Sequence, residues 1–185
     1  IEGDRWIVSV GGWQGDHAPT DEKSFNEYVR QLPTPDIYRV VSQAEPLSEI
    51  TAFKYPFSLR RHYEHLERFP LGLLVLGDSV CSFNPTYGQG MTSAAKQTAA
   101  LDELLASGTD DARLATSFFK KASRIIDIPW QLAVGEDFRY PTTTGPKPAG
   151  IDLLNRYVAM VHRATLVDPV VCNAFLKVMN LFEPP

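Results

Sequence analysis

The sequence predicts an α/β or α+β fold, in which a mixed sheet is followed by a C-terminal helical region. Three observations predict this fold. Residues Trp6–Val10 alternate like a half-buried strand, and Leu73–Leu76 form the continuous apolar run that is typical of a strand buried on both faces. From residue 108 onward, apolar residues recur at helical spacing in three successive stripes. With 185 residues, 44% of them hydrophobic, the chain can bury a core of its own.

The N-terminal part is predicted to contain two strands and two helices. Its first strand ends at a pair of glycines. A helix is expected to begin after Thr20, a residue type that caps helix N-termini, and to stop at Pro33. A second, short helix is expected within residues 35–44. The alternation at residues 53–57 predicts another strand, and the proline within it favours a sheet edge.

The middle of the chain is predicted to form a strand, a loop and a helix. The strand Leu73–Leu76 ends at Gly77-Asp78, the loop runs to Gly90, and the helix covers Met91–Ala106. Gly108 follows the predicted helix, where a glycine commonly ends helices. The helix face that we expect to point into the core is rich in alanine and consists of Met91, Ala94, Ala95, Thr98, Leu101 and Leu105.

The last third of the chain is predicted to be helical. The first stripe lies within residues 114–126, and Pro129 is expected to end its helix. The second stripe covers residues 154–161. The third helix is predicted to begin at Asp168-Pro169, because a capping residue is followed there by proline at the first helical position.

The composition excludes several classes of function. A net charge of −4 and a pI near 5.6, without any basic run, argue against a nucleic-acid partner. No stretch of about 18 apolar residues occurs, so we expect no transmembrane segment. Cys81 and Cys172 do not make a disulfide framework, so the cytoplasm is the expected compartment. The chain begins at Ile1 and shows no signal peptide, which suggests that it is a piece of a longer protein.

The segment from Gly77 to Thr92 contains the residues best suited to hold a ligand. Asp78 is a hydrogen-bond acceptor at the carboxyl end of the predicted strand, where open α/β sheets bind ligands. The start of the following helix offers free backbone N–H groups and a positive helix dipole. Gly88 and Gly90 leave room for a flat or bulky group against these donors. An acceptor for hydroxyls next to donors for negative charge suits a nucleotide-like cofactor with a polyol arm.

This segment resembles the second FAD-binding motif of the class A flavoprotein monooxygenases, the flavin-dependent aromatic hydroxylases. That motif consists of Gly-Asp-Ala-Ala-His, a proline, two spaced glycines and Leu-Asn-x-Ala. Cys81 stands here in place of the usual histidine, and Thr92 in place of the usual asparagine. The cofactor-binding residues that the resemblance implies are Gly77, Asp78, Pro85, Gly88, Gly90, Met91 and Thr92.

The resemblance also implies a role for these residues. Asp78 would hold a hydroxyl of the FAD ribitol, and Pro85 would lie near the flavin face. The backbone N–H groups of Gly90, Met91 and Thr92 would reach the pyrimidine edge of the isoalloxazine. The expected fold is then a partial FAD-binding fold of the GR2 type.

Three segments of a longer enzyme follow from the resemblance. Residues 1–70 would be the second half of a substrate domain, residues 71–107 would return to the FAD-binding domain, and residues 108–185 would form the C-terminal helical region. The parent protein would reduce FAD with NAD(P)H and use O₂ to hydroxylate or epoxidise a small organic substrate. No G-x-G-x-x-G turn is present, so a missing N-terminal FAD-binding half or a homo-oligomer partner is expected.

Several other interpretations stay open. Flavin-dependent halogenases and reductases share the motif, and a fragment without the ADP-binding half could be a non-catalytic interaction module that does not hold FAD on its own. Ser79 resembles the nucleophile of the Gly-Asp-Ser-type esterases, but no aspartate is followed three residues later by the histidine that this family needs. The sequence identifies no catalytic acid or base. No metal is expected at His62 and His65, because no set of cysteines or carboxylates completes a metal site with them.

Overall fold

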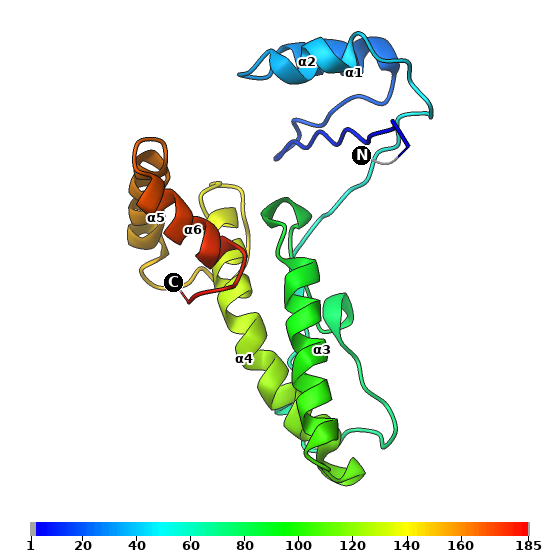
Figure 1. The fold of residues 1–185 in the computed structure, drawn as a ribbon. Coiled ribbons are helices and arrows are strands. Elements are labelled where there is room, and N and C mark those ends of the chain that lie inside the picture. Colours follow the sequence, from blue (N-terminus) through cyan, green and yellow to red (C-terminus); the bar gives the residue numbers. More distant parts are fainter. Residues whose placement is uncertain (1–2, 185) are drawn as a thin grey trace. The chain divides into compact units, whose positions relative to one another are not determined.

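The structure is a computed structural model that describes residues 3–184. The chain divides into two compact units, one up to Tyr55 and the other from Pro56 onward. The described residues form six α-helices, three 3₁₀ turns and one two-stranded sheet (Figure 1). No helix among them has the length and apolar character needed to cross a membrane. The predicted segments 1–70, 71–107 and 108–185 refer to a longer enzyme and stay a prediction.

The first unit contains the two helices that the sequence predicts, α1 (Glu22–Arg30) and α2 (Asp36–Val41). Asp21 caps α1 in place of the expected Thr20, because the Asp21 carboxylate accepts a hydrogen bond from the Ser24 N–H at 2.9 Å. An acidic group at this end also interacts favourably with the helix dipole.

The second unit begins with a minimal sheet. Strand β1 (Leu59–Arg60) pairs antiparallel with β2 (Cys81–Ser82), with Leu59 opposite Ser82 and Arg60 opposite Cys81. Three 3₁₀ turns flank these strands: η1 (Tyr63–His65), η2 (Gly77–Ser79) and η3 (Pro85–Tyr87).

Four helices make up the rest of the second unit. The long helices α3 (Gly90–Ala106) and α4 (Asp111–Asp137) lie side by side, and α5 (Ile151–Thr165) packs against α6 (Pro169–Met179) (Figure 1). The glycine expected beyond α3 is confirmed, since Gly108 has a positive φ of 68°. The helices that contain the second and third stripes are also confirmed.

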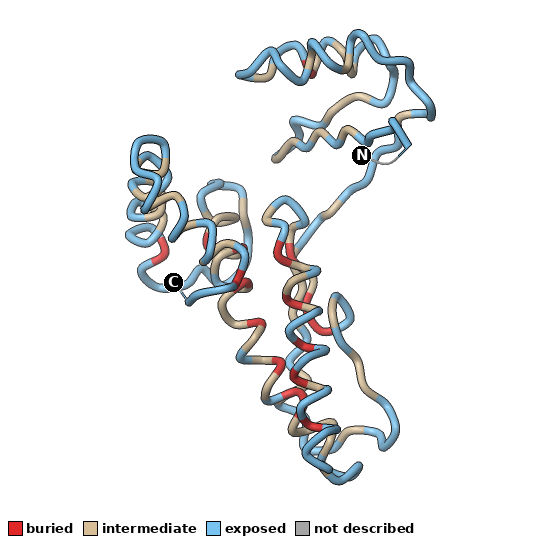
Figure 2. Tube along the Cα trace, viewed as in Figure 1, coloured by how far each residue is buried: buried red, intermediate tan, exposed pale blue. Residues whose placement is uncertain are grey.

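The core of the second unit lies where α3 and α4 face each other (Figure 2). Phe119 of α4 is central, because the rings of Tyr63 and Phe69 contact it with centroids 5.1 and 4.8 Å away. Aromatic packing therefore holds the segment that contains Tyr63 and Phe69 against α4. The buried residues of this cluster are Val80, Cys81, Phe83, Leu104, Phe118, Phe119, Ala122, Ile126 and Ala133.

The predicted α/β or α+β fold is wrong. The described chain is mostly helical, and its sheet joins two strands of two residues each. None of the predicted strands at residues 6–10, 53–57 and 73–76 is present. A strand forms only where its N–H and C=O groups bond to a neighbouring strand, and no described segment provides one for these three. The mixed sheet of a partial GR2-type FAD-binding fold is therefore absent from the described residues.

Helix α3 follows its predicted bounds but buries a different face. Its buried residues are Ser93, Gln97, Ala100 and Leu104. Within the predicted inner face, Met91 is 87% exposed and Leu105 is 56% exposed. The buried side combines Leu104, which belongs to the core cluster, with Gln97, which bonds to the turn η2.

Helix α4 continues through Pro129 to Asp137, although the sequence predicts that it ends at Pro129. A proline inside a helix costs about 3 kcal/mol, because its N–H is missing and its ring crowds the preceding turn. Pro129 is fully buried, as are Ile126 and Ala133 of the same helix. We attribute the continuity of α4 to this burial, which offsets the cost of the proline.

Candidate functional site

The predicted cofactor-binding residues lie on three consecutive elements, η2, η3 and the start of α3. Gly77 begins η2 with a positive φ of 63°, a conformation that favours glycine. A Cβ added to Gly77 would lie 3.5 Å from the Cβ of Ala94 on α3. The turn therefore packs closely on α3, with its backbone against the helix.

Gln97 fixes this turn to α3 through hydrogen bonds. The Gly77 N–H donates to Gln97 Oε1 at 2.9 Å, and Gln97 Nε2 donates to Ser93 Oγ at 3.2 Å. Gln97 is 1% exposed, so its amide is buried with both ends bonded. Buried polar groups are tolerated when they are hydrogen-bonded in this way. Sequence analysis did not identify Gln97 as part of the site.

Asp78 and Gly90 meet at the N-terminus of α3. A Cβ added to Gly90 would lie 3.9 Å from Asp78 Oδ1, so the carboxylate lies beside the first residue of the helix. No side chain caps α3. The first N–H groups of a helix have no partner within the helix, so those of Gly90, Met91 and Thr92 are available donors there.

The turn η3 leads into this position. Asn84 caps η3, because its Oδ1 accepts from the Thr86 N–H at 3.1 Å. Pro85 is exposed at the start of the turn. Gly88 ends it with φ +68°, and a Cβ there would meet no atom within 4 Å. The space beside Gly88 is therefore open, and its role in making room for a ligand stays a prediction.

Gln89, between the two glycines, is a buried residue that the sequence reasoning missed. It is 2% exposed, and its Nε2 donates to the carbonyl of Met179 at the end of α6, 3.0 Å away. Its Oε1 is buried and has no hydrogen-bond partner among the described residues. An unpaired buried acceptor costs about 1–3 kcal/mol, so Gln89 attaches the loop to the end of α6 at some cost in stability.

Tyr87 and Asp137 connect the loop to the end of α4. The Tyr87 hydroxyl donates to Asp137 Oδ1 at 2.8 Å, and the Ser58 hydroxyl donates to Oδ2 at 3.5 Å. Burial raises the pKa of both Tyr87 and Asp137 above their ordinary values. This pair holds the loop in place, and sequence reasoning missed it because the two residues are far apart along the chain.

Two other residues of the segment are poorly suited to nucleophilic chemistry. Burial raises the pKa of the Cys81 thiol to about 12, which keeps it protonated and unreactive near neutral pH. Ser79 lies exposed in η2, and no histidine is bonded to it in the described part of the chain. Ser79 therefore lacks the partner that the nucleophile of an esterase triad needs.

The comparisons with known proteins show a distant similarity. The chain is 27% identical over 190 residues to Protein Rv3254 of Mycobacterium tuberculosis, an alignment that covers 98% of this chain and 39% of that protein. The chain thus spans about two-fifths of the length of this curated relative. No protein-family model matches the chain. The name of this relative states no activity, so the similarity gives no information about the chemistry of the chain.

Proposed function

We propose that the chain is the C-terminal part of an FAD-dependent oxidoreductase, a monooxygenase that hydroxylates or epoxidises a small organic substrate with NAD(P)H and O₂. The observation that supports it most is the position of Asp78 Oδ1, 3.9 Å from where a Gly90 Cβ would lie. A carboxylate acceptor and a helix N-terminus therefore share one place, as a polyol arm joined to an electron-rich ring requires. The two free cysteines favour a reducing compartment, the cytoplasm.

Gly88 also supports the proposal, because no atom lies within 4 Å of where its side chain would stand, which leaves room beside the turn for a flat ring. Asp78 would bind a ribityl hydroxyl, and the N–H groups of Gly90, Met91 and Thr92 would bind the pyrimidine carbonyls.

The chain contributes binding and electrostatics to the proposed reaction. FAD, when bound, supplies the redox chemistry and the activation of O₂. The N-terminus of α3 stabilises negative charge beside it, since the helix dipole is positive at that end. Asp78 orients the cofactor by accepting a hydrogen bond. The Tyr87–Asp137 hydrogen bond keeps the η3 loop against the helix start.

Removing the Asp78 carboxylate from the full-length protein tests the proposal. Asp78→Ala is expected to weaken FAD affinity by roughly 10- to 100-fold, because a hydrogen bond to a charged group contributes about 1.5–3 kcal/mol. Flavin fluorescence during an FAD titration measures this affinity. Asp102→Ala is the matched control, since Asp102 is an exposed acid on α3, the helix whose N-terminus lies beside Asp78.

Two results would contradict the proposal. One is a full-length protein that is colourless when purified and stays so after FAD is added. The other is an FAD affinity that Asp78→Ala and Asp102→Ala leave equally unchanged. An isolated 185-residue chain that holds no FAD, beside a full-length protein that does, would favour the alternative of a piece that is non-catalytic on its own.

A further inference from the structure

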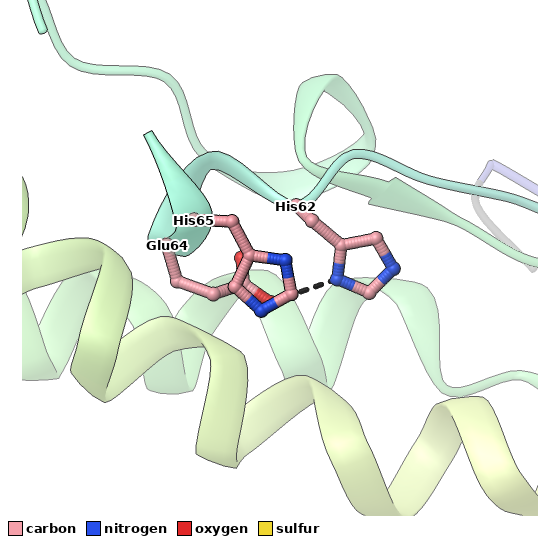
Figure 3. A group of neighbouring side chains, drawn as sticks. All are labelled: His62, Glu64 and His65. Carbon is pink, nitrogen blue, oxygen red and sulfur yellow. Dashed lines mark hydrogen bonds and ion pairs between the residues drawn. The ribbon is translucent and has the colours of Figure 1, made fainter. Parts of the chain in front are cut away.

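Outside the Gly77–Thr92 segment, the chain brings two histidines and a glutamate together at η1. His62 and His65 lie three residues apart, and in a 3₁₀ turn side chains at that spacing point the same way. Their rings are nearly parallel, with centroids 5.1 Å apart. Figure 3 shows the Glu64 side chain beside them, with a dashed line from His62. The sequence reasoning counted the two histidines and overlooked the carboxylate between them.

Three potential ligand atoms lie within one small space. One nitrogen of each histidine and one oxygen of Glu64 are all within 4.8 Å of one another. His62 Nδ1 is 2.9 Å from Glu64 Oε1. Ligand atoms bound at about 2.0–2.2 Å from a zinc ion lie roughly 3–3.5 Å from one another. Side-chain rotations that bring the three atoms closer together by about 1.5 Å would therefore let all of them bind one ion.

The backbone beneath the three side chains is held by the core. Tyr63, within the same turn, packs its ring on Phe119 of α4. The turn is closed by the His65 N–H, which donates to the His62 carbonyl at 3.1 Å. An ion would therefore find a turn whose backbone is already fixed, and the side chains that would have to move are the two exposed histidines and the partly buried Glu64.

Arg60 is held by a second carboxylate besides Glu64. It contacts Asp127 at 2.7 Å and Glu64 at 3.3 Å, so the shorter contact with Asp127 can hold Arg60 when Glu64 turns to an ion. Charged side chains of both signs also lie in the same segment of the chain: Arg61, Glu67 and Arg68. The three ligand atoms, and not the net charge around them, therefore support a metal site.

We propose that His62, Glu64 and His65 bind a divalent transition-metal ion, with Zn²⁺ as the best match. Two imidazole nitrogens and one carboxylate oxygen suit Zn²⁺, and three protein ligands leave a fourth position for water. The ion replaces the hydrogen bond between His62 and Glu64. Arg60 keeps its shorter contact, with Asp127, when Glu64 turns to the ion.

The test is a titration of Zn²⁺ into the chain by isothermal calorimetry. The protein carries Cys172→Ser, so that its partly exposed thiol does not compete for the ion. One equivalent of Zn²⁺ is expected to bind, and His62→Ala or His65→Ala is expected to lower the affinity at least tenfold. The visible absorption of Co²⁺ bound in place of Zn²⁺ provides a second readout of direct ligation. His17→Ala is the control, an exposed histidine of the other unit.

The result that overturns the proposal is equally specific. It is an affinity for Zn²⁺ weaker than about 1 mM, or an affinity that His65→Ala and His17→Ala change to the same extent. Glu64→Gln removes the third ligand but also leaves Arg60 with one carboxylate, so the decision rests on the two exposed histidines. Circular dichroism of these variants verifies that the helices are retained.

Discussion

At the scale of single residues, Gln97 connects the candidate site to the core. Its side chain is buried on α3, yet it accepts from the Gly77 N–H and donates to Ser93. The position of Asp78 beside Gly90 depends on this turn, because Asp78 is the next residue after Gly77. A buried amide on α3 thus fixes the acceptor that we propose binds the cofactor.

Gln97→Leu is expected to destabilise the chain by about 1–3 kcal/mol. Leucine fills a similar volume, but the Gly77 N–H then loses its acceptor and stays partly buried. Urea denaturation followed by circular dichroism measures the loss. Gln131→Leu is the matched control, because Gln131 is exposed on α4 and such surface changes stay within about 0.5 kcal/mol. Equal losses in the two variants would show that the hydrogen bond to Gly77 does not stabilise the fold.

Sequence reasoning found some residues of the site and missed others for a physical reason. Asp78, Gly88 and Gly90 were identified because a glycine in a turn and an acid before a helix are local signals. Gln97 and Asp137 were missed because their bonding partners lie 20 and 50 residues away along the chain. From sequence alone, a polar helix residue that will be buried looks the same as one exposed to water, because its hydrogen-bond partner is not known.

At the scale of elements, the same distinction separates helices from strands. The helices were predicted because their caps, stop signals and apolar periodicity lie within each segment. The predictions of strands at 6–10 and 73–76 were wrong, since pairing with a distant segment decides whether a strand forms. The predicted helix end at Pro129 was wrong for a different reason, because tertiary packing of α4 outweighs a local helix-breaking signal.

The cap of α6 gives an element-scale prediction. Asp168 Oδ1 accepts from the N–H groups of Val170 and Val171, at 2.8 and 3.3 Å. Asp168→Ala is expected to cost about 1 kcal/mol of stability, whereas Asp168→Asn retains most of it because asparagine caps equally well. Thermal or urea unfolding measures both variants. A loss of the same size for alanine and asparagine would mean that the charge of Asp168, and not its hydrogen bonds, stabilises α6.

At the scale of the whole molecule, a large apolar surface remains exposed. In the second unit, Met91 and Leu105 of α3, with exposed fractions of 87% and 56%, belong to the face that the sequence predicted to be buried. We infer that a second copy of the chain covers this face of α3 in solution, because no described residue of the chain covers it.

The isolated chain is therefore expected to associate as its concentration rises. Solvent-exposed apolar patches favour contacts that remove them from water, at about 25 cal/mol per Å². Sedimentation velocity across a concentration series measures the association. A double variant, Met91→Lys with Leu105→Lys, places two positive charges on this face of α3. It is expected to shift the chain toward monomer.

The control for this face is Ile7→Lys in the other unit, where Ile7 is 93% exposed. If association depends on α3, the control associates like the unmodified chain while the double variant does not. The prediction that this face of α3 is buried is wrong within the described chain, since the buried residues of the helix lie on another side. A chain that stays monomeric at every concentration would contradict this inference, because the apolar residues of α3 would then remain exposed to water without driving association.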